Sequence, residues 1–283
     1  MSEQSDHGQQ TGPQPDAHPR PLAGKRVLLI GASAGIGRAL AIRLVQDGAQ
    51  VIMSARRGPE LAKVAAEAGG GIPVQADITS AADCARLGQT VRDRLGQVDI
   101  LVSSVGVAVL RMMADTEPAD WRQTFETNVI GFHQVLRACL PSLVPDAIVA
   151  AMSSESVDEP RAALGAYSAS KVALERALTA WRTEHPGFRF CRIRVGATTP
   201  TEFSSGFDMP TLVHALGEWA KRGLAQDRFM TPAEVAGTIA GLLTVASDHP
   251  GTCLDEVTVR SPAAVVATHD EAIARRAEAI GQQ

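Results

Sequence analysis

Two hydrophobic patterns alternate along the chain. Short apolar runs, rich in branched residues and bounded by glycine or polar residues, occupy 25–30, 50–54, 72–76, 98–102, 147–152, 188–195 and 254–259. Runs of this length are typical of strands buried on both faces of a parallel sheet. Segments with the apolar spacing of helices lie between them, among them 60–68, 81–96 and a long helix that opens at Pro118. The alternation predicts an α/β fold, with a doubly wound parallel sheet in a single domain.

The composition of the chain predicts where this domain begins and ends. Residues 1–21 lack an apolar signal core and are rich in Gln, Pro, Gly, Asp and His, so we expect a disordered leader. The domain is expected over 22–262, followed by a polar, Ala-rich helical tail over 263–283. Within the domain, 201–224 is unusually apolar for a segment outside the sheet. We interpret it as a substrate lid; the alternative is a pair of helices that packs on a neighbouring subunit.

Charge and composition narrow the class of partner. The 283 residues carry a net charge of −4 and have a pI of about 6.0. This charge favours neither nucleic acid nor an anionic membrane as a binding partner. No run of 18 apolar residues is present, so no spanning helix is expected. The four cysteines are scattered without metal-ligand or redox spacing, so we expect no metal and a cytoplasmic, reducing location.

A glycine-rich turn joins the first predicted strand to the first predicted helix. It runs from Gly31 through Ser33, Ala34, Gly35 and Ile36 to Gly37. Glycines there let the backbone approach a pyrophosphate, and the helix N-terminus presents free N–H groups to it. In this strand–turn–helix setting the motif predicts a Rossmann-type dinucleotide site, although a glycine-rich turn without a ligand is the alternative.

The end of the second strand indicates which dinucleotide binds. An NAD site often places a carboxylate there, whereas this chain has Arg56 and Arg57. Guanidinium groups can hold a 2′-phosphate, so the sequence favours NADP(H); alternatively one or both arginines, Arg57 above all, are plain surface charges. Asp77 could accept from the adenine amino group or merely cap its turn. Further cofactor contacts are expected where other strands end, at Ile78, Ser104, Gly106, Gly196 and Thr198.

Tyr167 is the only tyrosine, and Lys171 follows it one helical turn later. A cation beside a phenol lowers the pKa of the phenol and suits it to proton transfer. The alternative is a surface tyrosine beside a solvated lysine. Ser154 follows the fifth predicted strand at the expected ligand edge. Asn128 lies inside the long helix, a position that indicates either a specific polar partner or simple exposure.

Together these motifs resemble the short-chain dehydrogenase/reductase family over about residues 22–259. The resemblance implies that Tyr167 is the general acid or base, and that Lys171 holds the nicotinamide ribose and depresses the pKa of Tyr167. It also implies that Ser154 binds the substrate oxygen and that Asn128 holds a water that links Lys171 to solvent. It further implies a homodimer or homotetramer, formed through the helices that carry Asn128 and Tyr167.

The chain departs from the family pattern at several places. Ile30 replaces a threonine before the first glycine, 103–106 reads Ser-Ser-Val-Gly instead of Asn-Asn-Ala-Gly, and Val195 replaces a proline. The final strand also lacks a Gly-Gly ending. None of these changes touches the four residues with implied catalytic roles.

We therefore predict an oxidoreductase that moves a hydride between NADP(H) and a carbonyl or alcohol substrate, which is expected to be apolar. One alternative is a non-catalytic NADP(H)-sensing or scaffold protein of the same fold. Another is an isomerase or dehydratase, because fold does not fix function.

Overall fold

A parallel sheet forms the centre of the computed structural model, which describes residues 20–226 and 228–262 together with Asp270, Ala274 and Ala277. Within these residues seven strands pair in parallel in the order β3-β2-β1-β4-β5-β6-β7. Their bounds are Arg26–Ile30 (β1), Gln50–Ala55 (β2), Ile72–Gln75 (β3), Val98–Ser103 (β4), Leu143–Ser154 (β5), Arg189–Val195 (β6) and Glu256–Val259 (β7). The strand order reverses between β1 and β4, so the predicted doubly wound sheet is confirmed.

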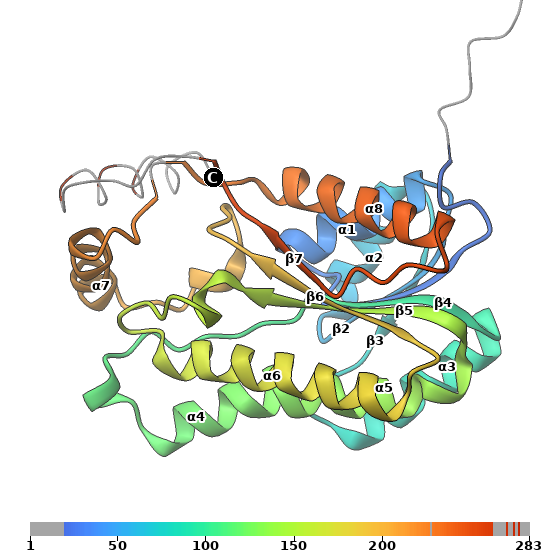
Figure 1. Ribbon diagram of the computed structural model, residues 1–283, viewed down its shortest axis with the longest axis horizontal. Helices are drawn as coiled ribbons and strands as arrows, with labels where there is room; N and C mark the ends of the chain where they lie inside the picture. The colour runs from blue at the N-terminus through green and yellow to red at the C-terminus, as the bar shows by residue number, and fades with distance from the viewer. Residues whose placement is uncertain (1–19, 227, 263–269, 271–273, 275–276, 278–283) are drawn as a thin grey trace, which may run out of the picture.

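Helices cover both faces of the sheet, as Figure 1 shows. One face carries α1 (Gly35–Gln46), α2 (Gly58–Ala68) and α8 (Pro232–Asp248). The other carries α3 (Ala81–Leu95), α4 (Pro118–Phe125), α5 (Phe132–Cys139) and α6 (Gly165–Glu184). Helix α7 (Met209–Lys221) lies apart from both layers, beyond one end of the sheet.

The two helical layers explain why the strands are apolar almost without interruption. Successive side chains of a strand point to opposite faces of the sheet. Leu29 and Met53 accordingly pack in the core under α1, α2 and α8. Leu28 and Ile52, their immediate neighbours along the chain, pack in the core under α3, α5 and α6.

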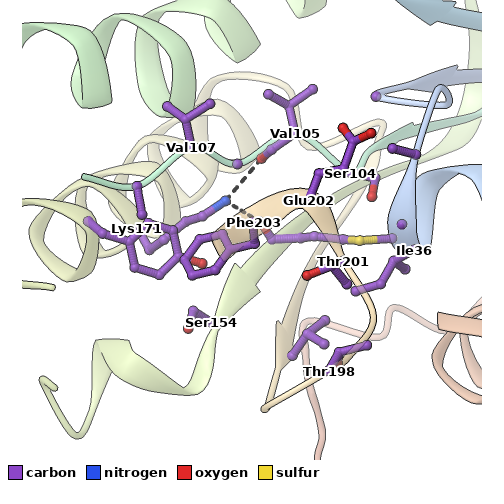
Figure 2. A pocket seen from close by; sticks show the side chains of 18 of the residues that line it. Ile36, Ser104, Val105, Val107, Ser154, Lys171, Thr198, Thr201, Glu202 and Phe203 are labelled. Atoms are coloured by element: carbon purple, nitrogen blue, oxygen red, sulfur yellow. Dashed lines mark hydrogen bonds between the residues drawn. The ribbon is translucent and has the colours of Figure 1, made fainter. Parts of the chain in front are cut away.

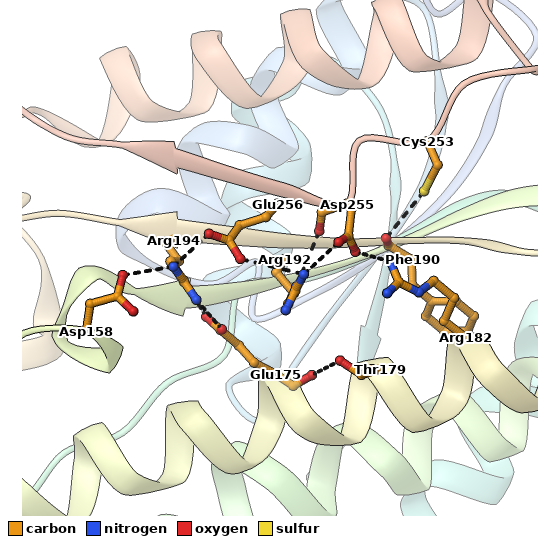
Figure 3. Close-up of polar contacts among 10 residues, drawn as sticks. All are labelled: Asp158, Glu175, Thr179, Arg182, Phe190, Arg192, Arg194, Cys253, Asp255 and Glu256. Carbon is orange, nitrogen blue, oxygen red and sulfur yellow. Dashed lines mark hydrogen bonds and ion pairs between the residues drawn. The ribbon is translucent and has the colours of Figure 1, made fainter.

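The sixth strand is only partly apolar because its arginines pair with acids on neighbouring elements (Figure 3). Arg194 binds Glu175 of α6 at 2.7 Å and Glu256 of β7 at 2.7 Å. Arg192 binds Asp255, just before β7, at 2.7 Å. These ion pairs hold the short edge strand β7 and helix α6 against β6.

The long helix predicted from Pro118 is not a uniform α-helix. Residues Glu126–Gly131 form a π-helix between α4 and α5, and Asn128 lies inside it. A π-turn holds one more residue than an α-turn, which changes the direction of the side chains it carries. The prediction was right on the position of the helix and missed this insertion.

None of the helices in the described part of the chain is both long and apolar enough to cross a membrane. The predicted leader over 1–21 and the predicted tail over 263–283 lie almost entirely outside the described residues. The segment predicted as a lid contains a short 3-10 turn, Glu202–Ser204, followed by α7.

Candidate functional site

A cavity of about 640 Å³ lies where the strands of the sheet end. Nearly all residues predicted for the site line it: Gly31, Ser33, Ala34, Gly35, Ile36, Arg56, Arg57, Asp77, Ile78, Ser104, Gly106, Ser154, Tyr167, Lys171, Gly196 and Thr198. The two predicted residues that do not line it are Gly37 and Asn128. Among the described residues, no group of three or more His, Cys, Asp or Glu side chains could hold a metal ion.

The glycine-rich turn is held by backbone contacts. Gly31 has a φ of +86°, and its N–H donates to the Ser54 carbonyl at 2.7 Å. A Cβ on Gly37 would stand 2.0 Å from the Gly31 carbonyl oxygen, so this close approach of helix to turn requires glycine. Helix α1 begins without a side-chain cap, which leaves its first N–H groups free for an anion. The turn thus forms although Ile30 supplies no hydroxyl to brace it.

The two arginines after β2 differ in their contacts. Arg56 is exposed and makes no hydrogen bond or ion pair with other described residues. Arg57 instead binds both carboxylate oxygens of Glu202, at 2.8 and 2.6 Å, and the hydroxyl of Ser33 at 3.2 Å. Arg57 is therefore more than a plain surface charge, and an anion that binds it must compete with Glu202.

Asp77 caps its own turn. One of its carboxylate oxygens, Oδ1, accepts from the backbone N–H of Thr79 at 2.9 Å and from its hydroxyl at 2.8 Å. The structure thus shows the cap, and because Asp77 also lines the cavity beside Ile78, its contact with adenine stays a prediction.

Lys171 is a buried ammonium group with 2% exposure. Its Nζ donates to the carbonyl oxygens of Val105 at 3.1 Å and Met152 at 2.9 Å, and Figure 2 shows it pointing into the cavity near Phe203. Burial lowers the pKa of Lys171 to about 8, while the negative charge of Glu175 opposes this shift. The lysine therefore joins the ends of β4 and β5 to helix α6.

Tyr167 is nearly buried, and its pKa is shifted in the direction opposite to the prediction. Burial raises the pKa of Tyr167 to about 12. A hydrogen bond with Ser154 and the positive charge of Arg161 act in the opposite direction but do not outweigh burial. The Nζ of Lys171 lies 5.8 Å from the centre of the ring. The expectation that the lysine lowers this pKa overlooked the desolvation of the phenolate.

Asn128 makes specific polar contacts behind the cavity. Its Oδ1 accepts from the Val107 N–H at 2.9 Å, and its Nδ2 donates to the Val107 carbonyl at 2.9 Å and to Ser170 Oγ at 2.9 Å. Ser170 in turn donates to the Tyr167 carbonyl at 2.7 Å. Of the two alternatives, the polar partner is the one observed. The side chain positions the loop after β4, and the predicted water link stays a prediction.

The segment after β6 closes the apolar end of the cavity. The Phe203 ring meets the Tyr167 ring edge-on at 5.0 Å, and Phe207 packs on Phe203 at 5.5 Å. From α7, Leu212 and Leu216 join the same hydrophobic cluster. The apolar residues of this segment therefore pack against the site of their own chain.

Three charged residues near the site were not found from the sequence. Glu202 pairs with Arg57, and Glu155 pairs with Arg161 between Ser154 and Tyr167. Their place after strands at the ligand edge was a signal for Glu155 and Glu202. The pairing of Glu202 with Arg57 could not be found, because it depends on how two distant loops fold together. The pairing of Glu155 with Arg161 depends on the conformation of a single loop, which leaves no periodic pattern in the sequence.

The sheet order and the cavity at the strand ends define a Rossmann-type fold, and comparison with known proteins identifies the family. The model of the short chain dehydrogenase family matches residues 25–212. A glycine betaine reductase of Emericella nidulans is 33% identical over 226 residues, which are 77% of this chain and 17% of that protein. The chain belongs to the short-chain dehydrogenase family. It spans about half or less of the length of the curated relatives it matches first.

Solved structures show the same fold. A short chain dehydrogenase from Burkholderia cenocepacia has a TM-score of 0.73 and 23% identity, and the match covers 88% of this chain and 99% of that one. A 3-ketoacyl-(acyl-carrier-protein) reductase from Brucella melitensis has a TM-score of 0.72 and 23% identity, with 85% and 98% covered. At this sequence identity the similarity supports only a shared fold.

The lowered pKa of Lys171 predicts a pH-dependent stability. Between pH 8 and 10.5 the unfolded chain binds the proton at this lysine and the folded chain does not, so the free energy of unfolding rises with pH there. Relative to Lys171→Met, the wild-type protein should gain about 3 kcal/mol across this window and lose it again as the pH falls to 8. Urea unfolding of both proteins at several pH values measures the difference; a constant difference would contradict the prediction.

Proposed function

We propose that the protein transfers a hydride between NADP(H) and a carbonyl or alcohol substrate, with Tyr167 as the general acid or base. The observation that carries this proposal is that residues predicted to bind the cofactor and residues predicted to be catalytic line the same cavity. The glycine-rich turn and Arg56 line it at one end, and Ser154, Tyr167 and Lys171 line it at the other.

The chain's own residues would handle the proton and the substrate oxygen. The nicotinamide group supplies or accepts the hydride when it is bound. The raised pKa of Tyr167 keeps its phenol protonated at neutral pH, so the hydroxyl is ready to donate to a carbonyl oxygen. Ser154, which lies within hydrogen-bond reach of Tyr167, would stabilise negative charge on the same oxygen. The surrounding apolar residues would exclude water.

The preference for NADP(H) rests on charge at the end of β2. Arg56 faces the cavity without a partner among the described residues, and no acid follows β2 directly. Arg57 and Ser33 lie beside each other at 3.2 Å and would complete a phosphate site once Glu202 is displaced. The Burkholderia relative was solved in complex with NADP and the Brucella relative with NADH, so the proposal depends on the residues of this chain.

We also propose a homodimer or homotetramer formed through the helical layer of Asn128 and Tyr167. Two large apolar side chains are exposed there: Ile130, two residues after Asn128, at 44%, and Val172 of α6, at 48%. Both project from packed, neighbouring helices, so a partner could cover them together.

The first test removes the proposed proton donor. Tyr167→Phe keeps the ring that packs on Phe203 and deletes only the hydroxyl, so NADPH binding should be retained. Turnover of a reducible ketone or aldehyde should fall by about 10²- to 10⁴-fold. Steady-state rates and an NADPH titration on the same protein separate the two effects. Undiminished turnover would contradict the role of Tyr167, and a wild-type protein that binds NADPH without turnover would favour the sensing alternative.

A second test concerns the cofactor. Arg56→Ala should weaken NADPH binding by about 10- to 100-fold, the loss expected for a charge-assisted hydrogen bond, and should leave NADH binding nearly unchanged. Fluorescence titration with both cofactors measures this. Arg94→Ala is a matched control, because Arg94 lies in the last turn of α3 and does not line the cavity. An equal loss for both cofactors would refute the phosphate role of Arg56.

A third test concerns assembly. Placing a charge in the proposed interface, as in Ile130→Glu combined with Val172→Glu, should yield a smaller species in analytical ultracentrifugation because a buried unpaired carboxylate is costly. Gln89→Glu places an acid on the exposed side of α3 and serves as the control. If the wild-type chain is already a monomer, or if the double variant keeps its size, the proposed interface is wrong.

A further inference from the structure

The cavity wall next to Tyr167 contains an ion pair. Arg161 donates through Nη2 to Glu155 Oε1, and the two side chains are only 12% and 13% exposed. Both residues belong to the segment that joins β5 to α6, the segment that also delivers Ser154 and Tyr167. Arg161 lines the cavity, and its charge acts on Tyr167. The pair therefore lies at the substrate end of the site.

An ion pair is unexpected at this position because several of the side chains around it are apolar. Leu164, Leu216 and Trp219 line the same region. Taking two charges out of water costs several kcal/mol per ion unless hydrogen bonds compensate. A hydrophobic pair of similar size would close the wall without that cost. Packing alone therefore does not explain why this wall contains a charged pair.

The guanidinium group retains hydrogen-bonding capacity. It has five N–H donors. In the described part of the chain only Nη2 donates, to Glu155 and, at 3.5 Å, to the Leu224 carbonyl oxygen. One face of the group lies 5.9 Å from the centre of the Trp219 ring. Nε and Nη1 are left to serve a ligand in the cavity.

The existing charge balance indicates which ligand suits these donors. Glu155 already neutralises Arg161, so a ligand carboxylate would add a second negative charge beside Glu155 in a poorly solvated site. A neutral carbonyl oxygen could accept from Nε or Nη1 without changing the net charge.

We propose that Arg161 is a specificity-determining residue that binds a second, neutral carbonyl oxygen of the substrate, such as that of an ester, amide or second ketone. This inference rests on the proposed function, since the first oxygen is the one that exchanges a proton with Tyr167. The substrate class is then a dicarbonyl compound, or the corresponding hydroxy-carbonyl compound, with an apolar remainder.

The test compares 3-oxo esters with alkyl ketones of matched chain length, both reduced with NADPH. The wild-type protein should prefer the esters. Arg161→Met removes a charge that acts on Tyr167 and therefore affects both substrates, but it should lower the ratio of kcat/KM for the esters to kcat/KM for the ketones by about 10- to 100-fold, mainly through the KM of the esters. Arg161→Lys keeps the charge opposite Glu155 but loses the planar fork, so it should restore the preference only in part. Equal losses for esters and ketones would mean that Arg161 merely supports the wall, and would overturn the proposal.

A separate experiment tests whether Arg161 binds a substrate carboxylate instead of a neutral carbonyl oxygen. Matched 3-oxo carboxylates should be poor substrates of the wild-type protein and should improve in Glu155→Gln, where the repelling charge is gone. If the wild-type protein prefers the carboxylates to the esters, the guanidinium recognises an anion and the proposal of a neutral acceptor is wrong.

A binding experiment separates this inference from the proposed function. The same esters and ketones are titrated by calorimetry into NADPH-loaded Tyr167→Phe protein and into Tyr167→Phe combined with Arg161→Met. Tighter binding of the esters that is lost with Arg161 supports the inference even where turnover is absent. Equal binding of esters and ketones overturns it, whatever the wild-type protein catalyses.

Discussion

The buried ammonium group of Lys171 is the contact on which the site depends. Its two hydrogen bonds end on backbone carbonyls of Val105 and Met152, so they fix main chain after β4 and within β5. Tyr167 stands one helical turn earlier on the same helix and is therefore fixed against the same two strands. Because the group is buried, losing either carbonyl would leave a charge without compensation. Geometry at the substrate oxygen thus follows from the packing of α6 on the sheet.

The loop after β4 is held from a second side by Asn128. The π-helix gives this asparagine a position from which both ends of its amide reach the backbone of Val107, and it also donates to Ser170 of α6. The loop after β4, the π-helix and helix α6 are therefore joined by hydrogen bonds into one unit. A rigid loop matters here because its residues Ser104 and Gly106 face the cavity where a dinucleotide would lie. Such preorganisation costs nothing at the moment of reaction.

The sequence was sufficient for the sheet and for bringing the glycine-rich turn, Tyr167 and Lys171 to one cavity, because burial on both faces and glycine-rich turns leave local signals. It was insufficient where the outcome depends on distant parts of the chain. Glu202 and Arg57 are 145 positions apart, and no pattern relates them. The sign of the Tyr167 pKa shift depends on how tightly Phe203 and its neighbours cover the phenol. The π-helix was missed because its residues are equally compatible with an α-helix.

The two perturbed groups also explain how the site could work in both directions. With a pKa near 12, Tyr167 is a proton donor at neutral pH, as the reduction of a carbonyl requires. Oxidation of an alcohol requires the phenolate, and a positive charge on Lys171 nearby would stabilise that anion. The pKa of Lys171 is about 8, so the lysine carries this charge below pH 8 and loses it above. Raising the pH thus favours the deprotonated phenol while removing the cation that stabilises it, and in the proposed reaction these opposing effects would confine alcohol oxidation to a limited pH range.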